Sequence, residues 1–265
     1  MSEHSIITLT TDFGTSDSYV GIMKGVILSI NPKAKIIDIT HSIPPQDINS
    51  AGFTLRNSFS FFPEKTIHLA VVDPGVGSKR SPILIKTEKY FFIGPDNGFF
   101  SSIISNEKIE YIIEITNKNY FLKKVSRTFH GRDIFAPVTA HLSTGKSPDT
   151  FGPDLKNPII TPFPEPCIIN SNEAEGEVLH IDRFGNLLTN ISTSFIEEVA
   201  GTKSFYLEVN NIPISKIVPY YAAAEDDELF CIVGSSDLLE ISIKNSNAQK
   251  SARIQRGDKV RIIYN

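Results

Sequence analysis

Tryptophan is absent from the 265 residues of the sequence, and cysteine and methionine occur only twice each. The cysteines, Cys167 and Cys231, fit no spacing of a metal site, so we expect both to be free thiols in a reducing compartment. The six histidines form neither an H-x-x-x-H nor an H-E-x-x-H motif. We therefore expect no metal site, although His41, Asp47 and His130 could still converge on an ion in the folded chain.

An excess of positive charge and long apolar runs are also lacking. The net charge is −4 and the sequence pI is about 5.9, which gives no basic footprint for nucleic acid or anionic lipid. No stretch approaches about 18 uninterrupted apolar residues, and no basic leader is visible, so we expect a soluble, cytoplasmic protein. Hydrophobic residues make up 40% and charged residues 21%, enough for one large or two modest folded domains.

The first half of the chain alternates between strand-like and helix-like patterns. The predicted order is strand 5–11, helix 19–30, strand 34–40, helix 47–62, strand 66–73, hairpin 83–94 and helix 133–145. The third strand is apolar throughout, which is typical of a strand that is covered on both faces. This alternation predicts an N-terminal α/β domain with layers of helix around a mostly parallel sheet.

Proline then becomes dense, because six of the sixteen prolines lie between Pro148 and Pro166. Such a stretch disfavours helices and central strands, so we interpret it as an extended connection between domains. Short strand patterns follow and predict a small β-barrel or sandwich. They cover residues 175–191, 203–209, 228–243 and 258–264. We therefore place the α/β domain at 1–160, a proline-rich linker at 161–172, and a C-terminal β-barrel domain at 173–265.

The turn VVDPGVGSKRS, residues 71–81, begins like a phosphate-binding loop but does not match the G-x-x-x-x-G-K-[ST] pattern. Asp73 at its mouth would also repel a phosphate. Asp73 and Arg80 span this turn, and His130 in FHGRD precedes a predicted helix. An Asp, an Arg and a His at turns could activate a small nucleophile. Alternatively, the first two form an ion pair that staples the loop, and His130 is an ordinary surface residue.

Other polar residues stand at the ends of predicted strands, where open α/β sheets bind ligands. Asp12 follows the first strand and could accept both hydroxyls of a ribose, or Asp12 or Asp17 could cap the next helix. Asp182, Phe184 and Asn186 surround a glycine in HIDRFGNLLTNI. An aromatic face and an amide suit a flat heterocycle, although a plain hairpin turn would use the same residues.

A further polar segment is IVGSSDLLEISIKNSNA, residues 232–248. Ser235, Ser236 and Asn247 flank its predicted strand. They are candidates for binding a ligand, and ordinary loop polarity is the alternative interpretation.

Taken together and in this order, the segments resemble the S-adenosylmethionine hydroxide adenosyltransferases, relatives of the fluorinase and chlorinase enzymes. The resemblance runs over nearly the whole chain. It is carried by TLTTDFGTSDSYVGIMKGVI, HSIPPQDINSAGF, VVDPGVGSKR, GPDNG, FHGRDIFAPVTAHL, IDRFGNLLTNI and LLEISIKNSNA. It implies an N-terminal α/β domain, a C-terminal β-barrel and a homotrimer. In that trimer the substrate would lie between the N-terminal domain of one subunit and the C-terminal domain of its neighbour.

The resemblance also implies roles for individual residues. Asp12 matches the carboxylate that holds the ribose hydroxyls, and Tyr221 matches an aromatic residue that packs on the nucleoside. The positions around the methionine amine and carboxylate are Asp17, Asp182 and Ser235, and Ser236 is a further substrate-binding position. The adenine pocket corresponds to Phe184 and Asn186, with the backbone near Asn247 and Ala248. The triad that distinguishes the hydroxide-using branch from the halogenases corresponds to Asp73, Arg80 and His130.

Two departures from the family pattern are visible. Gln46 stands where the fluorinase has a tryptophan, and GSSDLLEI departs from the usual asparagine-serine-aromatic-glycine-tyrosine pattern. The resemblance implies hydrolysis of S-adenosylmethionine to adenosine and L-methionine, without a cofactor or metal. The alternatives are a halogenase that makes a 5′-halo-adenosine, and a non-catalytic sensor of S-adenosylmethionine or a nucleoside. A sensor would need the pocket residues but not the triad.

Overall fold

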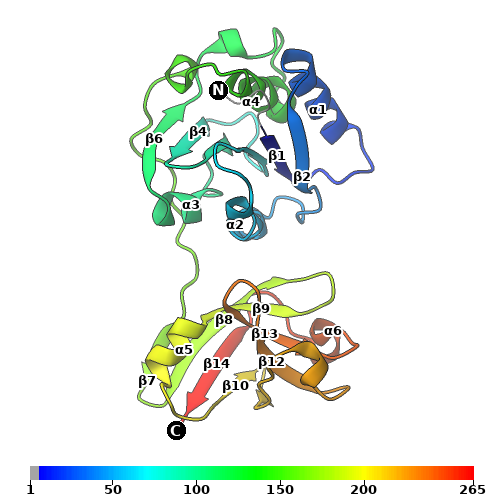
Figure 1. Cartoon of the computed structure of the whole chain (residues 1–265), viewed down its shortest axis with the longest axis vertical. Helices are drawn as coiled ribbons and strands as arrows, with labels where there is room; N and C mark the ends of the chain where they lie inside the picture. Colours follow the sequence, from blue (N-terminus) through cyan, green and yellow to red (C-terminus); the bar gives the residue numbers. More distant parts are fainter. Residues whose placement is uncertain (1–5) are drawn as a thin grey trace. The chain divides into compact units, whose positions relative to one another are not determined.

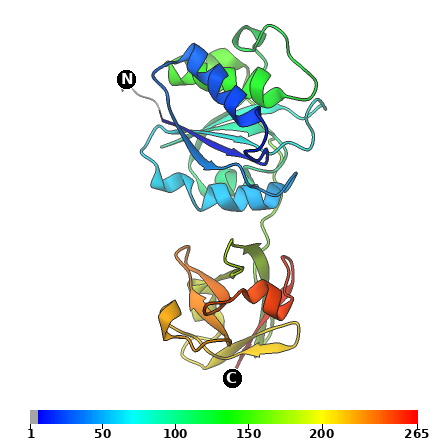
Figure 2. The ribbon, with the colours of Figure 1, turned by 90° about the vertical axis from the view of Figure 1, so that its right-hand side faces the viewer.

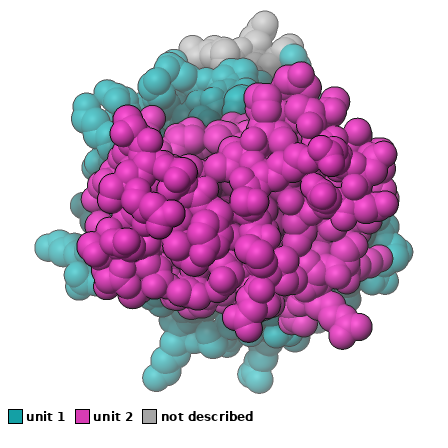
Figure 3. Space-filling view, turned by 90° about the horizontal axis from the view of Figure 1, so that it is seen from below, with its two compact units in different colours: residues 1–162 teal, residues 163–265 magenta. Residues whose placement is uncertain are grey.

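The structure of the chain, a computed structural model, describes residues 6–265. The chain divides into two compact units, Met1–Pro162 and Phe163–Asn265, which are coloured separately in Figure 3. Each unit has its own hydrophobic core. Among residues 6–265, no helix has both the length and the apolar character that a membrane span requires. Cys167 is exposed, Cys231 is buried, and both are free, as predicted.

Unit 1 contains six strands and the main helices of the chain (Figure 1). In chain order its elements are β1 (Ile6–Thr11), α1 (Tyr19–Ile30), β2 (Lys35–Thr40), α2 (Ile48–Arg56), η1 (Phe59–Phe61), β3 (Ile67–Val71), β4 (Pro82–Thr87), β5 (Phe91–Pro95), α3 (Ser101–Asn106), β6 (Ile109–Glu114), η2 (Lys118–Tyr120), η3 (Gly131–Phe135), α4 (Ala136–Ser143) and η4 (Pro148–Phe151). The predicted strand 5–11 is confirmed as β1, except that Ser5 lies outside the described residues.

The strands of unit 1 form one sheet in the order β2-β1-β3-β5-β4-β6. Neighbouring strands from β2 to β5 are parallel, whereas β4 is antiparallel to both β5 and β6. The predicted α/β domain with a mostly parallel sheet is therefore confirmed, and so is the hairpin that extends it. Because parallel strands end at the same edge, the loops after β1 and β3 leave the sheet on the same side.

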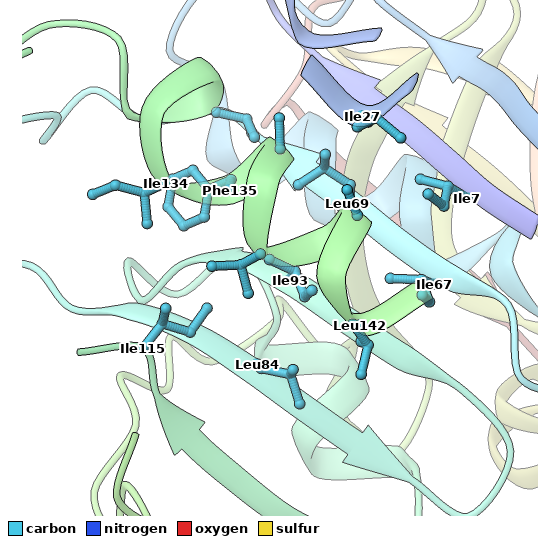
Figure 4. Close-up of a cluster of buried hydrophobic side chains, with 14 of the residues drawn as sticks. Ile7, Ile27, Ile67, Leu69, Leu84, Ile93, Ile115, Ile134, Phe135 and Leu142 are labelled. Carbon is cyan, nitrogen blue, oxygen red and sulfur yellow. The ribbon is translucent and has the colours of Figure 1, made fainter. Parts of the chain in front are cut away.

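Helices cover both faces of this sheet. Figure 2 shows α1 and α4 on one face and α2 on the other. The central strand β3 is buried along its whole length, and its side chains alternate between the two faces. Ile67 and Leu69 pack with Phe135 and Leu142 in the core beneath α4 (Figure 4), whereas Ala70 belongs to the opposite core. Burial on both faces explains why this strand is apolar throughout.

The helix predicted over 47–62 is shorter than expected. Its N-cap is confirmed, because Asp47 Oδ1 accepts a hydrogen bond from Ser50 N at 3.0 Å. The helix ends at Arg56 and is followed by the short 3-10 helix η1. The Ser58 hydroxyl donates to Thr54 O at 2.8 Å, and such local bonds compete with continuation of a helix. Sequence patterns also missed α3 and β6.

Most of the proline-rich stretch lies along unit 1. Leu155 N donates to Ile112 O in β6 at 2.7 Å, and Ile159 N donates to Asp96 Oδ1 at 2.9 Å. The chain up to there begins with η4 and is not an interdomain connection, because its backbone groups bond to β6 and to Asp96, which follows β5. At the other end, Cys167–Asn170, which we placed in the linker, forms a strand paired with β8.

Unit 2 is built mainly from antiparallel strands (Figure 1). Its elements are β7 (Cys167–Asn170), β8 (Glu173–Ile181), β9 (Leu187–Ser192), α5 (Thr193–Val199), β10 (Phe205–Val209), β11 (Ile212–Ile214), η5 (Tyr221–Ala223), β12 (Leu229–Val233), β13 (Leu238–Ile243), α6 (Ala248–Ala252) and β14 (Lys259–Tyr264).

These strands curl into a barrel. The order is β11-β10-β14-β8-β9-β13-β12, with β7 added beside β8. The segment after β11 reaches the other end of this series, because Cys231 N in β12 donates to Lys216 O at 2.8 Å and Val218 N donates back to Cys231 O at 3.0 Å. The sheet is thus nearly closed, and the predicted small β-barrel is confirmed.

Candidate active site

The turn between β3 and β4 brings the first two predicted catalytic residues together. Asp73 lies two residues beyond β3, and Val76 N donates to Asp73 O at 3.2 Å to start the turn. Gly77 has φ +78, and a Cβ at this position would lie 2.4 Å from Arg127 O. Only glycine fits there, so the turn packs tightly against the loop that leads to His130.

Asp73 and Arg80 form a buried ion pair across this turn. Arg80 Nε lies 3.0 Å from each carboxylate oxygen of Asp73, and Arg80 Nη2 also donates to Asp73 Oδ2. The two side chains are only 5% and 8% exposed, respectively. The Arg80 guanidinium carbon lies 5.2 Å from the centre of the Phe135 ring, which adds a cation–π contact. The guanidinium is therefore held from two sides.

His130 completes the group. Arg80 Nη2 donates to His130 Nδ1 at 2.9 Å. A guanidinium has no acceptor atom, so Nδ1 carries no proton and the ring proton must sit on Nε2. Burial, followed by the nearby charge of Arg80, lowers the pKa of His130. The ring is thus neutral at physiological pH, and the backbone of Ser126 is a further hydrogen-bond partner of the ring.

This arrangement agrees with the ion-pair interpretation. In addition to closing the loop, the ion pair binds His130 from another segment of the chain. Asp73 and His130 share the guanidinium of Arg80, which comes from the turn after β3, while His130 stands at the start of η3. A fixed cation and a neutral imidazole N–H form a preorganised donor set for a small anionic oxygen.

Asp12 stands at the end of β1, at the same sheet edge. Its Oδ2 accepts a hydrogen bond from Gln46 N at 2.8 Å, so it holds the turn before α2. The alternative that Asp12 or Asp17 caps α1 is not supported, because the N-cap residue is Ser18 and no side-chain bond caps it. Asp17 is exposed and lines a surface pocket of about 460 Å³ together with Lys24.

The three candidate metal ligands do not converge. His41 Nδ1 lies 2.9 Å from Thr11 Oγ1, and its Nε2 lies 3.0 Å from Asp38 Oδ1. Asp47 caps α2, and His130 is bound to Arg80. Within the described part of the chain, no group of three or more His, Cys, Asp or Glu side chains could hold a metal ion.

In unit 2, the turn between β8 and β9 gathers the predicted adenine residues. Asp182 Oδ1 accepts from Phe184 N at 2.8 Å and from Asn186 N at 2.9 Å, and Asp182 Oδ2 accepts from Asn186 Nδ2 at 2.9 Å. The hairpin interpretation is therefore correct as a description of the backbone. The turn leaves the Phe184 side chain 75% exposed and buries Asn186.

The start of α6 packs on this turn. Gly185 has φ +88, and a Cβ there would lie 2.2 Å from the Asn247 side chain. Asn247 Oδ1 accepts from Lys250 N at 2.8 Å and so caps α6, and Ala248 is fully buried. Ser235 and Ser236 belong to the β12–β13 turn, in which Gly234 N donates to Leu238 O at 2.8 Å.

Glu240 is a residue that the sequence interpretation missed. It lies on β13 and is buried, and its Oε2 accepts a hydrogen bond from the Tyr221 hydroxyl at 2.7 Å. Burial raises the pKa of Glu240, and the negative charge of Asp182 raises it further. Burial and then the bond to Glu240 raise the pKa of Tyr221. The available signal was a charged residue inside the apolar strand LLEISI.

Comparison with known proteins places this geometry in a family. Models for the N-terminal and the C-terminal domain of the S-adenosylmethionine hydroxide adenosyltransferases match residues 7–152 and 176–261, respectively. The chain therefore belongs to the S-adenosylmethionine hydroxide adenosyltransferase family, and the resemblance seen in the sequence is confirmed.

Individual relatives are similar over nearly the full length. The (R)-S-adenosyl-L-methionine hydrolase of Methanocaldococcus jannaschii is 38% identical over 98% of this chain and 96% of its own. The crystal structure of an uncharacterized conserved protein from Thermotoga maritima superposes with a TM-score of 0.90 at 34% identity, covering 97% of this chain and 99% of its own. A fluorinase of an Actinoplanes species is 27% identical over 73% of this chain and 74% of its own.

Proposed function

We propose that this protein hydrolyses S-adenosyl-L-methionine to adenosine and L-methionine by attack of water or hydroxide at the 5′ carbon. The observation that carries the proposal is the group formed by Asp73, Arg80 and His130 in a member of this family. Support also comes from the full-length relative in Methanocaldococcus jannaschii, whose name states the same hydrolysis. The fluorinase relative covers less of the chain at lower identity, which favours hydrolysis over halogenation.

The chemistry explains why such a group is needed. The sulfonium leaves as a neutral thioether, so the leaving group needs no acid. The nucleophile is the difficult part, because water has a pKa of about 15.7. Arg80 and the Nε2–H of His130 stabilise the anionic oxygen as water loses its proton to solvent, and each such donor is worth about 3 kcal/mol when preorganised. Asp73 holds the guanidinium in place with both carboxylate oxygens.

In the reaction itself, the oxygen forms a bond to the 5′ carbon while the bond from that carbon to sulfur breaks. The bonding electron pair goes to sulfur, which becomes the thioether of methionine. Attack by an anion on a sulfonium cancels charge, so a low local dielectric strengthens the attraction that drives it.

The decisive test is the origin of the new oxygen. Purified protein is incubated with S-adenosylmethionine in oxygen-18 water, and the products are analysed by mass spectrometry. We expect the label at the 5′ hydroxyl of adenosine, and an unchanged product when chloride is added. A 5′-chloro-adenosine as the main product would establish a halogenase. Tight binding without any turnover would establish a sensor instead.

No cofactor or metal takes part in this proposal. The donor set of Arg80 and His130 supplies the stabilisation of hydroxide that a metal ion would otherwise provide. Turnover should therefore survive exhaustive chelation. A loss of activity that one divalent ion restores would contradict this part of the proposal.

The proposal includes a homotrimer in the cytoplasm. The family resemblance supports the trimer. The division of the candidate site residues between the two units supports it as well, because the predicted ribose and nucleophile residues lie in unit 1 and the predicted adenine residues lie in unit 2. If neighbouring subunits share each site, two inactive variants complement each other. Co-expressed Asp73→Ala and Asn186→Ala chains should then regain activity well above either parent. Mixed trimers verified by mass spectrometry but inactive would show that each chain builds its site alone.

A further inference from the structure

Tyr221 combines exposure with a fixed orientation. Its side chain is 45% exposed, which is unusual for an aromatic ring whose polar atom is tied to a buried group. The hydroxyl donates to Glu240 Oε2 at 2.7 Å. The ring also meets the buried ring of Phe230 edge to face, with centroids 6.1 Å apart and planes at 76°. Two contacts therefore orient a ring that still has free surface.

Glu240 is itself held firmly. It is 8% exposed in the middle of β13, where its backbone pairs with β12 on one side and β9 on the other. The backbone of Gly234 lies over the carboxylate, because a Cβ at this glycine would be only 2.1 Å from Glu240 Oε1. One oxygen is thus enclosed by the turn, and the other is aimed at the tyrosine hydroxyl. Strand β13 therefore fixes the carboxylate that accepts the hydrogen bond from the Tyr221 hydroxyl.

We infer that Glu240 is a positioning residue, which acts through Tyr221 by holding its exposed ring in place to receive the flat face of a purine nucleoside. The inference rests on the proposed function for the identity of the ligand. It assigns Glu240 no contact with the reacting atoms. A ring that is already oriented loses little rotamer entropy when the ligand binds, so the anchor acts on affinity and leaves the chemical step unchanged.

Substitutions separate this role from a general contribution to folding. Tyr221→Phe keeps the ring and removes the anchored hydroxyl. Glu240→Leu keeps the volume and removes the acceptor. We expect each to raise both the dissociation constant for adenosine and the KM for S-adenosylmethionine about tenfold, with kcat changed less than twofold. Because both changes break the same bond, the double variant should be no weaker than either single variant.

Two further variants serve as controls. Glu240→Gln keeps an oxygen acceptor at the same place, so it should recover most of the affinity lost in Glu240→Leu. Tyr220→Phe removes the hydroxyl of the neighbouring exposed tyrosine and should bind adenosine like the wild type. Adenosine binding is measured by calorimetry, and turnover is measured separately by chromatography.

The binding measurements test the role of Glu240 separately from the proposed function. Wild-type binding by Tyr221→Phe, or losses that multiply in the double variant, would overturn the inference while leaving the proposed function intact. Should Glu240→Leu fail to fold, Tyr221→Phe is compared with Glu240→Gln/Tyr221→Phe, and equal affinities are expected. A wild-type protein that binds neither adenosine nor S-adenosylmethionine would refute the proposed function, and this inference with it.

Discussion

Asp73 in unit 1 and Glu240 in unit 2 are both largely buried carboxylates, but they face different partners. Asp73 is bound by the guanidinium of Arg80, whereas Glu240 accepts a hydrogen bond from the neutral hydroxyl of Tyr221. The first pair holds the guanidinium of Arg80, which also donates to His130 and is the donor that we propose for an anionic oxygen. The second fixes an aromatic ring and carries a pKa raised by burial. The buried carboxylate of unit 1 is therefore paired with a charge, and that of unit 2 with a neutral group.

The largest effect should come from removing the cation of unit 1. Arg80→Ala is expected to slow adenosine formation about 100- to 1000-fold, because the nucleophile loses its preorganised charged donor. Arg80→Lys should also be strongly impaired, since an ammonium cannot reproduce the fork that joins Asp73 to His130. Initial rates are measured on samples shown to be folded by circular dichroism. Lys79→Ala, an exposed neighbour in the same turn, should retain full activity.

The next effect concerns stability. Asp73→Ala leaves the buried guanidinium of Arg80 without its counter-charge, which should lower the free energy of unfolding of unit 1 by about 3 kcal/mol. Urea denaturation of the two proteins side by side measures this difference. Glu240→Gln is the comparison in unit 2, and it should cause no such loss at neutral pH, because the buried carboxylate has no counter-charge and its partner is neutral. Equal losses in the two variants would contradict the comparison between the units.

The smallest effect is the pH dependence of stability at Glu240. The pKa of this carboxyl in the folded protein is raised above its ordinary value of 4.5 by burial and by Asp182. Protonation therefore favours the folded state, so the cost of the ionised carboxylate disappears as the pH falls through the raised pKa. Glu240→Gln should be stabilised relative to wild type at neutral pH, and this advantage should shrink on acidification. A difference independent of pH would rule out this origin.

The regular elements of unit 1 were largely predictable, for local reasons. Helix α1 coincides with the predicted range, because its apolar residues recur at helical spacing and Asn31-Pro32 follows them. Strand β3 was predictable because burial on both faces makes every position apolar. The docking of residues 148–161 on β6 was not, since it depends on backbone bonds between distant segments that no local pattern reveals.

Most residues of the candidate site could be predicted from the sequence, but most of the contacts between them could not. The sequence placed Asp73, Arg80 and His130 at turns, but spacing alone left an ion pair and a nucleophile site both open and favoured the ion pair. The shared guanidinium results from tertiary packing of the turn against the loop before η3. Glu240 escaped notice because it lies inside a strand and not in a polar turn, and only the fold reveals that Tyr221 reaches it.

The wide helical turn η3 has a consequence for how this chain can change. Ala136 N donates to Gly131 O, five residues back, so Gly131–Phe135 holds one residue more than an α-helical turn would. Deleting a single codon here would restore ordinary α-helical winding without altering the identity of any triad residue. It would also rotate everything before the deletion by about 100° around the helix axis. His130 would then turn away from Arg80. The contact between these two residues therefore depends on the number of residues in η3 as well as on their identities.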